Sequence, residues 1–129
     1  MLLKHLKPAI CWAIFILILC SIPGNQLPET PFWNLLAFDK TAHMAVFLVF
    51  AVLLKVSFLK QHQFATLKYH ANKYTLIIAI LYGVIIELLQ SSLFTERFAD
   101  INDMIANAIG AVLGLFIFKL IYANCINNK

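Results

Sequence analysis

The feature that most constrains this chain is a series of four apolar runs, each close to the length of a membrane-spanning helix. The runs cover about residues 8–22, 41–59, 74–93 and 101–122, and a helix needs about 20 apolar residues to cross a bilayer. Charged residues make up 12% of the chain and hydrophobic residues 62%, whereas about 25% of the residues of a soluble domain are charged. The composition excludes an ordinary soluble fold and predicts that lipid covers most of the surface.

Residues that favour helix ends mark the limits of these runs. Pro8 begins the first run and Pro23 follows its end, while Asp39 and Asp100 stand just before the second and fourth runs, as N-caps would. The connections are short, so consecutive helices should alternate in direction. We therefore expect an all-α, membrane-spanning four-helix bundle with up-down-up-down topology, formed by residues 1–129 as one domain.

The first run also has features of a targeting signal. Lys4, His5 and Lys7 precede the apolar stretch, and residues 17–20 are similar to a lipoprotein box. No A-x-A-like cleavage site follows, however, and Leu19 is too large for the residue before a lipoprotein cysteine. We interpret the first run as a retained helix.

The cysteines do not indicate a disulfide framework or a zinc knuckle. Cys11, Cys20 and Cys125 are odd in number and form no CxxC pair. Cys11 and Cys20 are nine positions apart, about 13 Å along a helix, which is too far for a disulfide. We interpret all three as small apolar side chains.

The basic residues are distributed asymmetrically and predict the orientation of the bundle. Eight of the ten fall on one side of the predicted membrane: Lys4, Lys7, Lys55, Lys60, Lys68, Lys73, Lys119 and Lys129. The positive-inside rule makes that side cytoplasmic, with both termini inside. The net charge of +4 in so apolar a chain indicates membrane orientation rather than nucleic-acid binding, because no basic stripe interleaved with aromatic residues is present.

The opposite side carries Lys40, Arg97 and every acidic residue. The six acids are Glu29, Asp39, Glu87, Glu96, Asp100 and Asp103. The outer half of the molecule is therefore where polar chemistry is expected.

Glu87 is the most informative polar residue, because it lies within the third apolar run, where an unpaired charge is costly. The helical repeat of about 100° per residue places Gly83, Glu87 and Gln90 on one face. The second run presents Asp39 and His43 together in the same way. Each of these faces is expected to avoid lipid by pointing into the bundle.

The fourth run carries a third polar stripe, made of Asp103 and Asn107 with Gly110 and Gly114 behind them. A Gly-x-x-x-Gly spacing lets a neighbouring helix approach closely, which marks this face as a packing face. By themselves the glycines imply packing only. Together, the three stripes predict one polar cluster that opens to the outside.

Structural roles are open for several of these residues. Asp39 and Asp100 could be simple N-caps, with Asp103 completing a capping box, and His43 could bond Asp39 one turn before it. Gln90 is suited to satisfying a carbonyl of another helix.

Charge pairing offers further structural roles at the outer side. Arg97 could pair in water with Glu96 or Asp100. Glu87 could pair with His43 or Arg97 to lock the bundle.

In order and spacing, these residues resemble the signature of the VanZ-like family over about residues 21–114. The matching segments are Ser21-Ile22-Pro23, Asp39-Lys40-x-x-His43, Glu87-x-x-Gln90 and Arg97-x-x-Asp100-x-x-Asp103-x-x-x-Asn107-x-x-Gly110-x-x-x-Gly114. The resemblance implies a small multi-pass protein of the bacterial cytoplasmic membrane, related to one that raises tolerance to the glycopeptide teicoplanin. It implies functional roles for Asp39, His43, Glu87, Gln90, Arg97, Asp103 and Asn107, but neither an activity nor a cofactor.

The first functional hypothesis is recognition of an envelope lipid or its headgroup at the outer leaflet. The second and fourth helices both begin on the outside, so their positive dipole ends, with Lys40, Arg97 and a protonated His43, would face one region. The expected ligand-binding residues are Asp39, Lys40, His43, Glu87, Gln90, Arg97, Asp103 and Asn107. Against this hypothesis, six outer acids and two outer bases sum to −4, which repels an anion.

The alternative is a membrane-embedded, metal-dependent hydrolase or transferase that acts on a lipid-linked envelope substrate. His43, Glu87 and Asp103, the candidate catalytic residues, could hold a divalent cation with Asp39 close by; the imidazole would favour zinc or manganese. Arg97 would then steady developing charge. No HExxH-type metal signature is present, and we assign no metal at this stage.

A third hypothesis is transport or proton relay through Glu87. It ranks last, because four short helices offer little room for a pathway and the cytoplasmic halves of the runs look apolar.

Overall fold

The computed structural model describes residues 1–21, 38–93 and 100–127. For residues 38, 39 and 125–127 it describes the backbone alone. Within this part of the chain the fold is all-α, as expected. The helices are α1 (Leu2–Cys20), α3 (Phe38–Lys60), α4 (Ala65–Tyr69), α5 (Ala71–Leu93) and α6 (Ile101–Asn127). Four of them, all but α4, are long and apolar enough to cross a membrane.

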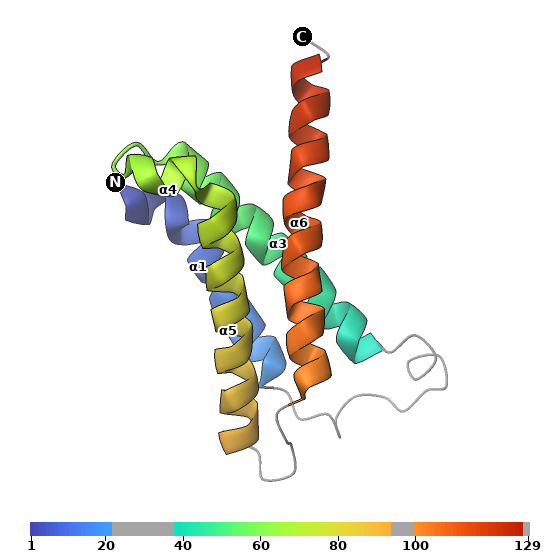
Figure 1. Cartoon of the computed structure of the whole chain (residues 1–129). Coiled ribbons are helices and arrows are strands. Elements are labelled where there is room, and N and C mark those ends of the chain that lie inside the picture. Colours follow the sequence, from blue (N-terminus) through green and yellow to red (C-terminus); the bar gives the residue numbers. More distant parts are fainter. Residues whose placement is uncertain (22–37, 94–99, 128–129) are drawn as a thin grey trace.

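The four long helices alternate in direction. Figure 1 shows α1 and α5 running down the view and α3 and α6 running up it, so the two chain ends lie at the same end of the bundle. The predicted up-down-up-down bundle is therefore confirmed. In the same view α6 crosses α3 obliquely instead of lying parallel to it.

All four long helices extend beyond the apolar runs that predicted them, and α3 begins at Phe38. α1 begins at Leu2 and contains Pro8, α5 begins at Ala71, and α6 continues to Asn127. Hydropathy marks only the part of a helix that lies in hydrocarbon, whereas backbone hydrogen bonding continues through the polar residues at its ends. Pro8 removes one N–H from the helical ladder of α1 without ending the helix.

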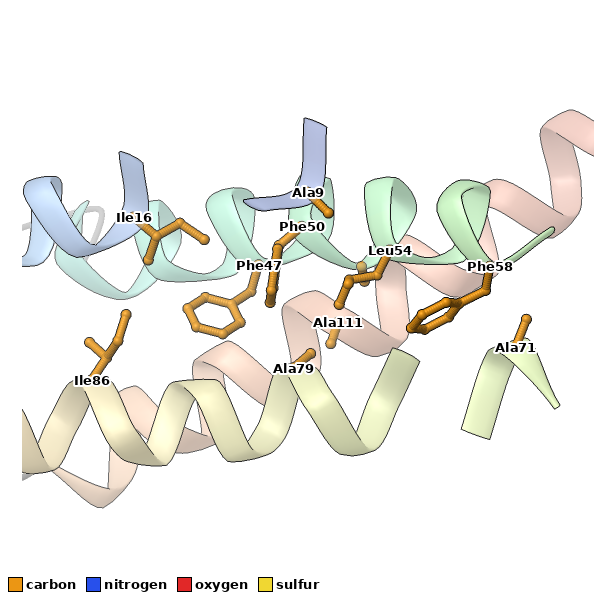
Figure 2. Packing of buried hydrophobic residues seen from close by; sticks show 11 residues of the cluster. Ala9, Ile16, Phe47, Phe50, Leu54, Phe58, Ala71, Ala79, Ile86 and Ala111 are labelled. Atoms are coloured by element: carbon orange, nitrogen blue, oxygen red, sulfur yellow. The ribbon is translucent and has the colours of Figure 1, made fainter. Parts of the chain in front are cut away.

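Helix α3 is the centre of the bundle and contacts each of the other helices. Its buried residues Phe47, Phe50, Leu54 and Phe58 recur at helical spacing and form one face. Figure 2 shows these side chains between α1, α5 and α6, with Ile86 of α5 among the residues facing them. His43 lies one turn before Phe47 on this face and is therefore directed into the bundle.

Helices α3 and α6 approach each other closely, and two glycines make this approach possible. A Cβ atom added to Gly110 would meet the carbonyl oxygen of Met44 and lie 2.9 Å from its Cα. A Cβ atom added to Gly114 would lie 2.5 Å from the carbonyl oxygen of Leu48. The Gly-x-x-x-Gly face is thus pressed against the backbone of α3, which brings Asn107, one turn before Gly110, beside His43.

Hydrogen bonds from side chains to backbone carbonyls tie α1 to its neighbours. The indole Nε1 of Trp12 donates to the carbonyl of Val46 at 2.8 Å, and the hydroxyl of Ser57 donates to the carbonyl of His5 at 2.7 Å. Tyr82 of α5 donates to the carbonyl of Ala13. In an apolar surrounding these bonds satisfy polar groups that lipid cannot solvate.

The helix contact predicts that enlarging Gly110 will destabilise the protein. Gly110→Leu forces its side chain into the α3 backbone, so we expect the free energy of unfolding to fall by about 1–3 kcal/mol. Thermal unfolding of the detergent-solubilised protein measures the change. Ala45→Leu, on the exposed side of α3, is the control and should leave the melting temperature nearly unchanged; equal melting temperatures for both variants would contradict the contact.

Candidate functional site

A buried cluster of three metal-ligating side chains lies where α3, α5 and α6 meet. His43, Glu87 and Asp103 are 6%, 1% and 7% exposed, respectively. Each offers one ligand atom, and these atoms all lie within 4.8 Å of one another. The polar stripes of three helices therefore converge at these residues, which are the three candidate catalytic residues of the sequence.

The start of α6 is held against α5 by Glu87. The backbone N–H of Asp100 donates to Oε2 of Glu87 at 3.3 Å, and Oδ1 of Asp100 accepts from the N–H of Asn102 at 2.8 Å. Asp100 is thus the N-cap of α6. In a capping box the N–H of Asp100 would donate to the side chain of Asp103, but here it donates to Glu87. Asp103 lies in the first turn of α6 and belongs to the cluster. The positive end of the helix dipole therefore lies beside the carboxylates of Asp103 and Glu87.

Asn107 fixes the imidazole of His43. Nδ1 of His43 lies 2.9 Å from Oδ1 of Asn107, and Asn107 is 1% exposed. A carbonyl oxygen only accepts hydrogen bonds, so in this arrangement Nδ1 is the donor and a metal ion would be bound through Nε2. Metal-ligating histidines usually donate their other N–H in this way, which fixes the tautomer and the orientation of the ring.

Gly83 makes room for Asn107. A Cβ atom at position 83 would lie 3.1 Å from Nδ2 and 3.2 Å from Cβ of Asn107. The sequence places Gly83 on the face of Glu87 but does not reveal this contact, because it depends on the register between α5 and α6. The only indication in the sequence is that Gly83 lies one turn before Glu87, an acid within an apolar run.

Other residues expected at the site are not among the three clustered ligands, or they fall outside the described residues. Gln90 is buried but its Nε2 donates to the carbonyl of Cys20 at 2.7 Å, which closes the end of α1 and fits the structural role considered for it. Lys40 is half-buried in the first turn of α3.

The remaining expectations concern residues that the structure does not describe in full. Asp39 was expected just before the second helix but lies inside it, since α3 begins at Phe38; its side chain is outside the described part. Arg97 and Pro23 are also outside the described residues.

The types of side chain in the cluster suit a divalent cation. One imidazole nitrogen and two carboxylate oxygens match the sites of zinc or manganese, and catalytic zinc sites use three protein ligands with a fourth position open. With the imidazole neutral and both carboxylates ionised, the three side chains would carry a charge of −2. A divalent cation would offset this charge, and the three helices would fix the relative positions of its ligands.

The fold and the cluster define a multi-pass membrane protein with a buried polar site. A family model described as VanZ/LLP1 matches residues 7–122. The chain therefore belongs to the VanZ/LLP1 family, which confirms the resemblance found in its sequence. Comparison with curated proteins and comparison with solved structures gave no match.

The cluster predicts stoichiometric binding of a metal ion. Protein purified with chelator and dialysed against Zn²⁺ or Mn²⁺ should retain about one ion per chain, measured by elemental mass spectrometry. Glu87→Gln removes one carboxylate ligand, so we expect its affinity for the ion to fall at least about tenfold.

Asp100→Asn is the matched control for this experiment. It removes a carboxylate at the same end of the bundle but outside the cluster, and asparagine preserves the N-cap. Its ion content should equal that of the wild type. A wild type without bound ion, or equal binding by Glu87→Gln, would contradict the metal site.

Proposed function

We propose that this protein is a membrane-embedded, metal-dependent hydrolase or transferase that acts on a lipid-linked substrate of the bacterial envelope. The proposal rests on one observation: His43, Glu87 and Asp103, from three different helices, bring their ligand atoms within 4.8 Å of one another in a buried position. Three ligands on separate helices are held in place by the whole bundle. Such rigidity suits a site that must position reacting atoms.

A divalent metal ion would weaken the electrostatic objection to an anionic substrate, because it would bring the outer charge from −4 to −2. Glu87 and Asp103 would repel the phosphate of a lipid headgroup if the cluster were empty and both were ionised. With a divalent cation bound, the charge of the three-residue set is zero, and the positive end of the α6 dipole adds attraction for an anion. Recognition of an envelope lipid, the first hypothesis from the sequence, then becomes the substrate-binding step of the enzyme.

In the proposed reaction, the metal ion and the protein side chains would have different roles. A zinc or manganese ion held by His43, Glu87 and Asp103 would supply Lewis acidity and would lower the pKa of water. In hydrolysis, the oxygen of water bonds to the phosphorus or acyl carbon, the bond to the leaving oxygen breaks, and a proton moves to that oxygen. In this proposal Glu87 or Asp103 would accept the proton of the water, and the hydrogen bond to Asn107 would keep the imidazole of His43 oriented. In a transferase, an acceptor hydroxyl takes the place of water.

The proposal places the protein in the bacterial cytoplasmic membrane as one VanZ-like transmembrane domain, residues 1–129. With both termini cytoplasmic, the cluster lies toward the outer leaflet, where lipid-linked wall precursors are found. Modification of such a precursor would account for the tolerance to teicoplanin that the family resemblance implies.

The proposed orientation predicts the behaviour of reporter fusions. Because both chain ends lie at the lysine-rich end of the bundle, green fluorescent protein fused to either terminus should fluoresce. Alkaline phosphatase, which folds only outside the cytoplasm, should be inactive at both positions. Active phosphatase at either terminus would reverse the orientation and place the cluster toward the cytoplasm.

The proposed activity predicts turnover that requires both the ion and the cluster. Purified protein in liposomes is supplied separately with a polyprenyl diphosphate and with phosphatidylglycerol, and lipid products are followed by mass spectrometry. Product should form with Zn²⁺ or Mn²⁺, disappear with chelator, and fall at least about 100-fold in Glu87→Gln, as is common when a catalytic group is removed.

Asp100→Asn serves again as the control and should retain the activity. Product formation that is insensitive to chelator would contradict the metal mechanism. Failure of both lipids to react in the presence of the ion would contradict the activity on these substrates.

A further inference from the structure

A second polar region lies at the other end of the bundle from the cluster. A cavity of about 490 Å³ is formed there by α3, α4, α5 and α6. Its lining includes the basic residues Lys55, Lys68, His70 and Lys73 together with Phe118. These residues fall near the end of α3, in and beside α4, at the start of α5 and late in α6, whereas the cluster uses the opposite ends of α3, α5 and α6.

Lys55 is the residue that makes this cavity unusual. It is only 9% exposed and lies inside the apolar span of α3, with its Nζ 4.3 Å from the centre of the Phe118 ring. A buried cation within a membrane-spanning helix is costly, and a contact with one aromatic face returns only about 0.5–2 kcal/mol. Lys119 adds to the cost, since its charge acts repulsively on Lys55.

Acidic residues do not compensate these cations within the described part of the chain. Glu87, Asp100 and Asp103, the acids whose side chains are described, lie at the end of the bundle that holds the cluster. Glu87 is 14 residues after Lys73 in α5, which is about 21 Å along the helix. The described lining of the cavity therefore carries positive charge that an external anion would balance.

We propose that this cavity binds the phosphate group of an anionic membrane lipid. Lysines are compact point charges that suit phosphate, and basic pockets between membrane helices near the bilayer surface are typical sites for anionic headgroups. The cavity also has apolar lining from Leu59 and Phe118, which suits the glycerol and upper acyl carbons of a lipid. This site is separate from the proposed metal centre and does not depend on it.

Short helix α4 fits the same interpretation. It lies at the turn between α3 and α5 at one end of the bundle in Figure 1, and its Tyr69 is 86% exposed while also lining the cavity. Tyrosine and lysine are enriched at the level of the headgroups. Lys68, at the end of α4, is therefore placed to reach a phosphate from the aqueous side.

Native mass spectrometry of the detergent-solubilised protein tests the proposal. Wild-type protein is titrated in parallel with phosphatidylglycerol and phosphatidylcholine. We expect one phosphatidylglycerol to be retained at least about fivefold more tightly than phosphatidylcholine, because each lysine near an anionic lipid contributes about 1 kcal/mol. Equal retention of the two lipids would overturn the proposal.

Variants locate the binding to the cavity. Lys55→Met and Lys73→Gln should each weaken binding of phosphatidylglycerol at least about fivefold, and Lys55→Arg should retain it. Lys60→Gln is the matched control: Lys60 is an exposed lysine at the end of α3 that does not line the cavity, and its loss should have no effect. If Lys55→Met fails to fold, Lys73→Gln, at an exposed position, still decides the question. Unchanged binding in Lys73→Gln would then overturn the site.

Competition with inorganic phosphate distinguishes a lipid headgroup from free phosphate as the ligand of the cavity. Phosphatidylglycerol retained against millimolar phosphate supports a lipid site. Binding of inorganic phosphate with the same dependence on Lys73, without any retained phosphatidylglycerol, would overturn the lipid and assign the cavity to a free anion.

Discussion

The close approach of α6 to α3 is the contact on which the candidate site depends. Gly110 and Gly114 lack the side chains that would hold the two backbones apart, and Asn107 and Asp103 lie one and two turns before Gly110 on the same helix. A larger residue at 110 would move these side chains away from His43. The glycines thus do more than pack, because the spacing they permit sets the hydrogen bond between His43 and Asn107.

The physical reason for the cluster is that hydrocarbon cannot solvate polar side chains. Each polar group in a spanning helix must find its partner in another helix or at a helix end. Glu87 does so through the N–H of Asp100, His43 through the amide of Asn107, and Gln90 through the carbonyl of Cys20. These bonds satisfy single donors and acceptors, but they leave two carboxylates close together. The proposed divalent cation would be held by these carboxylates together with His43.

The sequence predicts which segments are helical and which helix faces point inward. It predicts less well how one helix is positioned against another. Run length predicts the four spanning helices, and the helical repeat predicts that the stripes of Glu87 and Asp103 turn inward, because both depend only on local geometry. The role of Gly83 beside Asn107, the choice of Cys20 as the partner of Gln90, and the cavity around Lys55 depend on how one helix is shifted along another. A single sequence carries no direct signal for that shift. Helix α4 was missed for a related reason, since a five-residue helix is too short to show a hydrophobic period.

Electrostatic coupling between the two polar regions should be modest. His43 and Lys55 are 12 residues apart in α3, about 18 Å along the helix, and the buried rings of Phe47 and Phe50 lie between them in sequence and pack with Tyr82. At an effective dielectric constant of about 20, two unit charges at that separation interact by only about 1 kcal/mol. A divalent cation at the cluster and a singly charged phosphate at the basic cavity would thus interact by about 2 kcal/mol, and less where salt screens the charges. The same apolar layer separates Glu87 from the lysines at the other end, which argues against a proton relay through the bundle. The two proposed sites therefore lie at opposite ends of the bundle, with this packed aromatic layer between them.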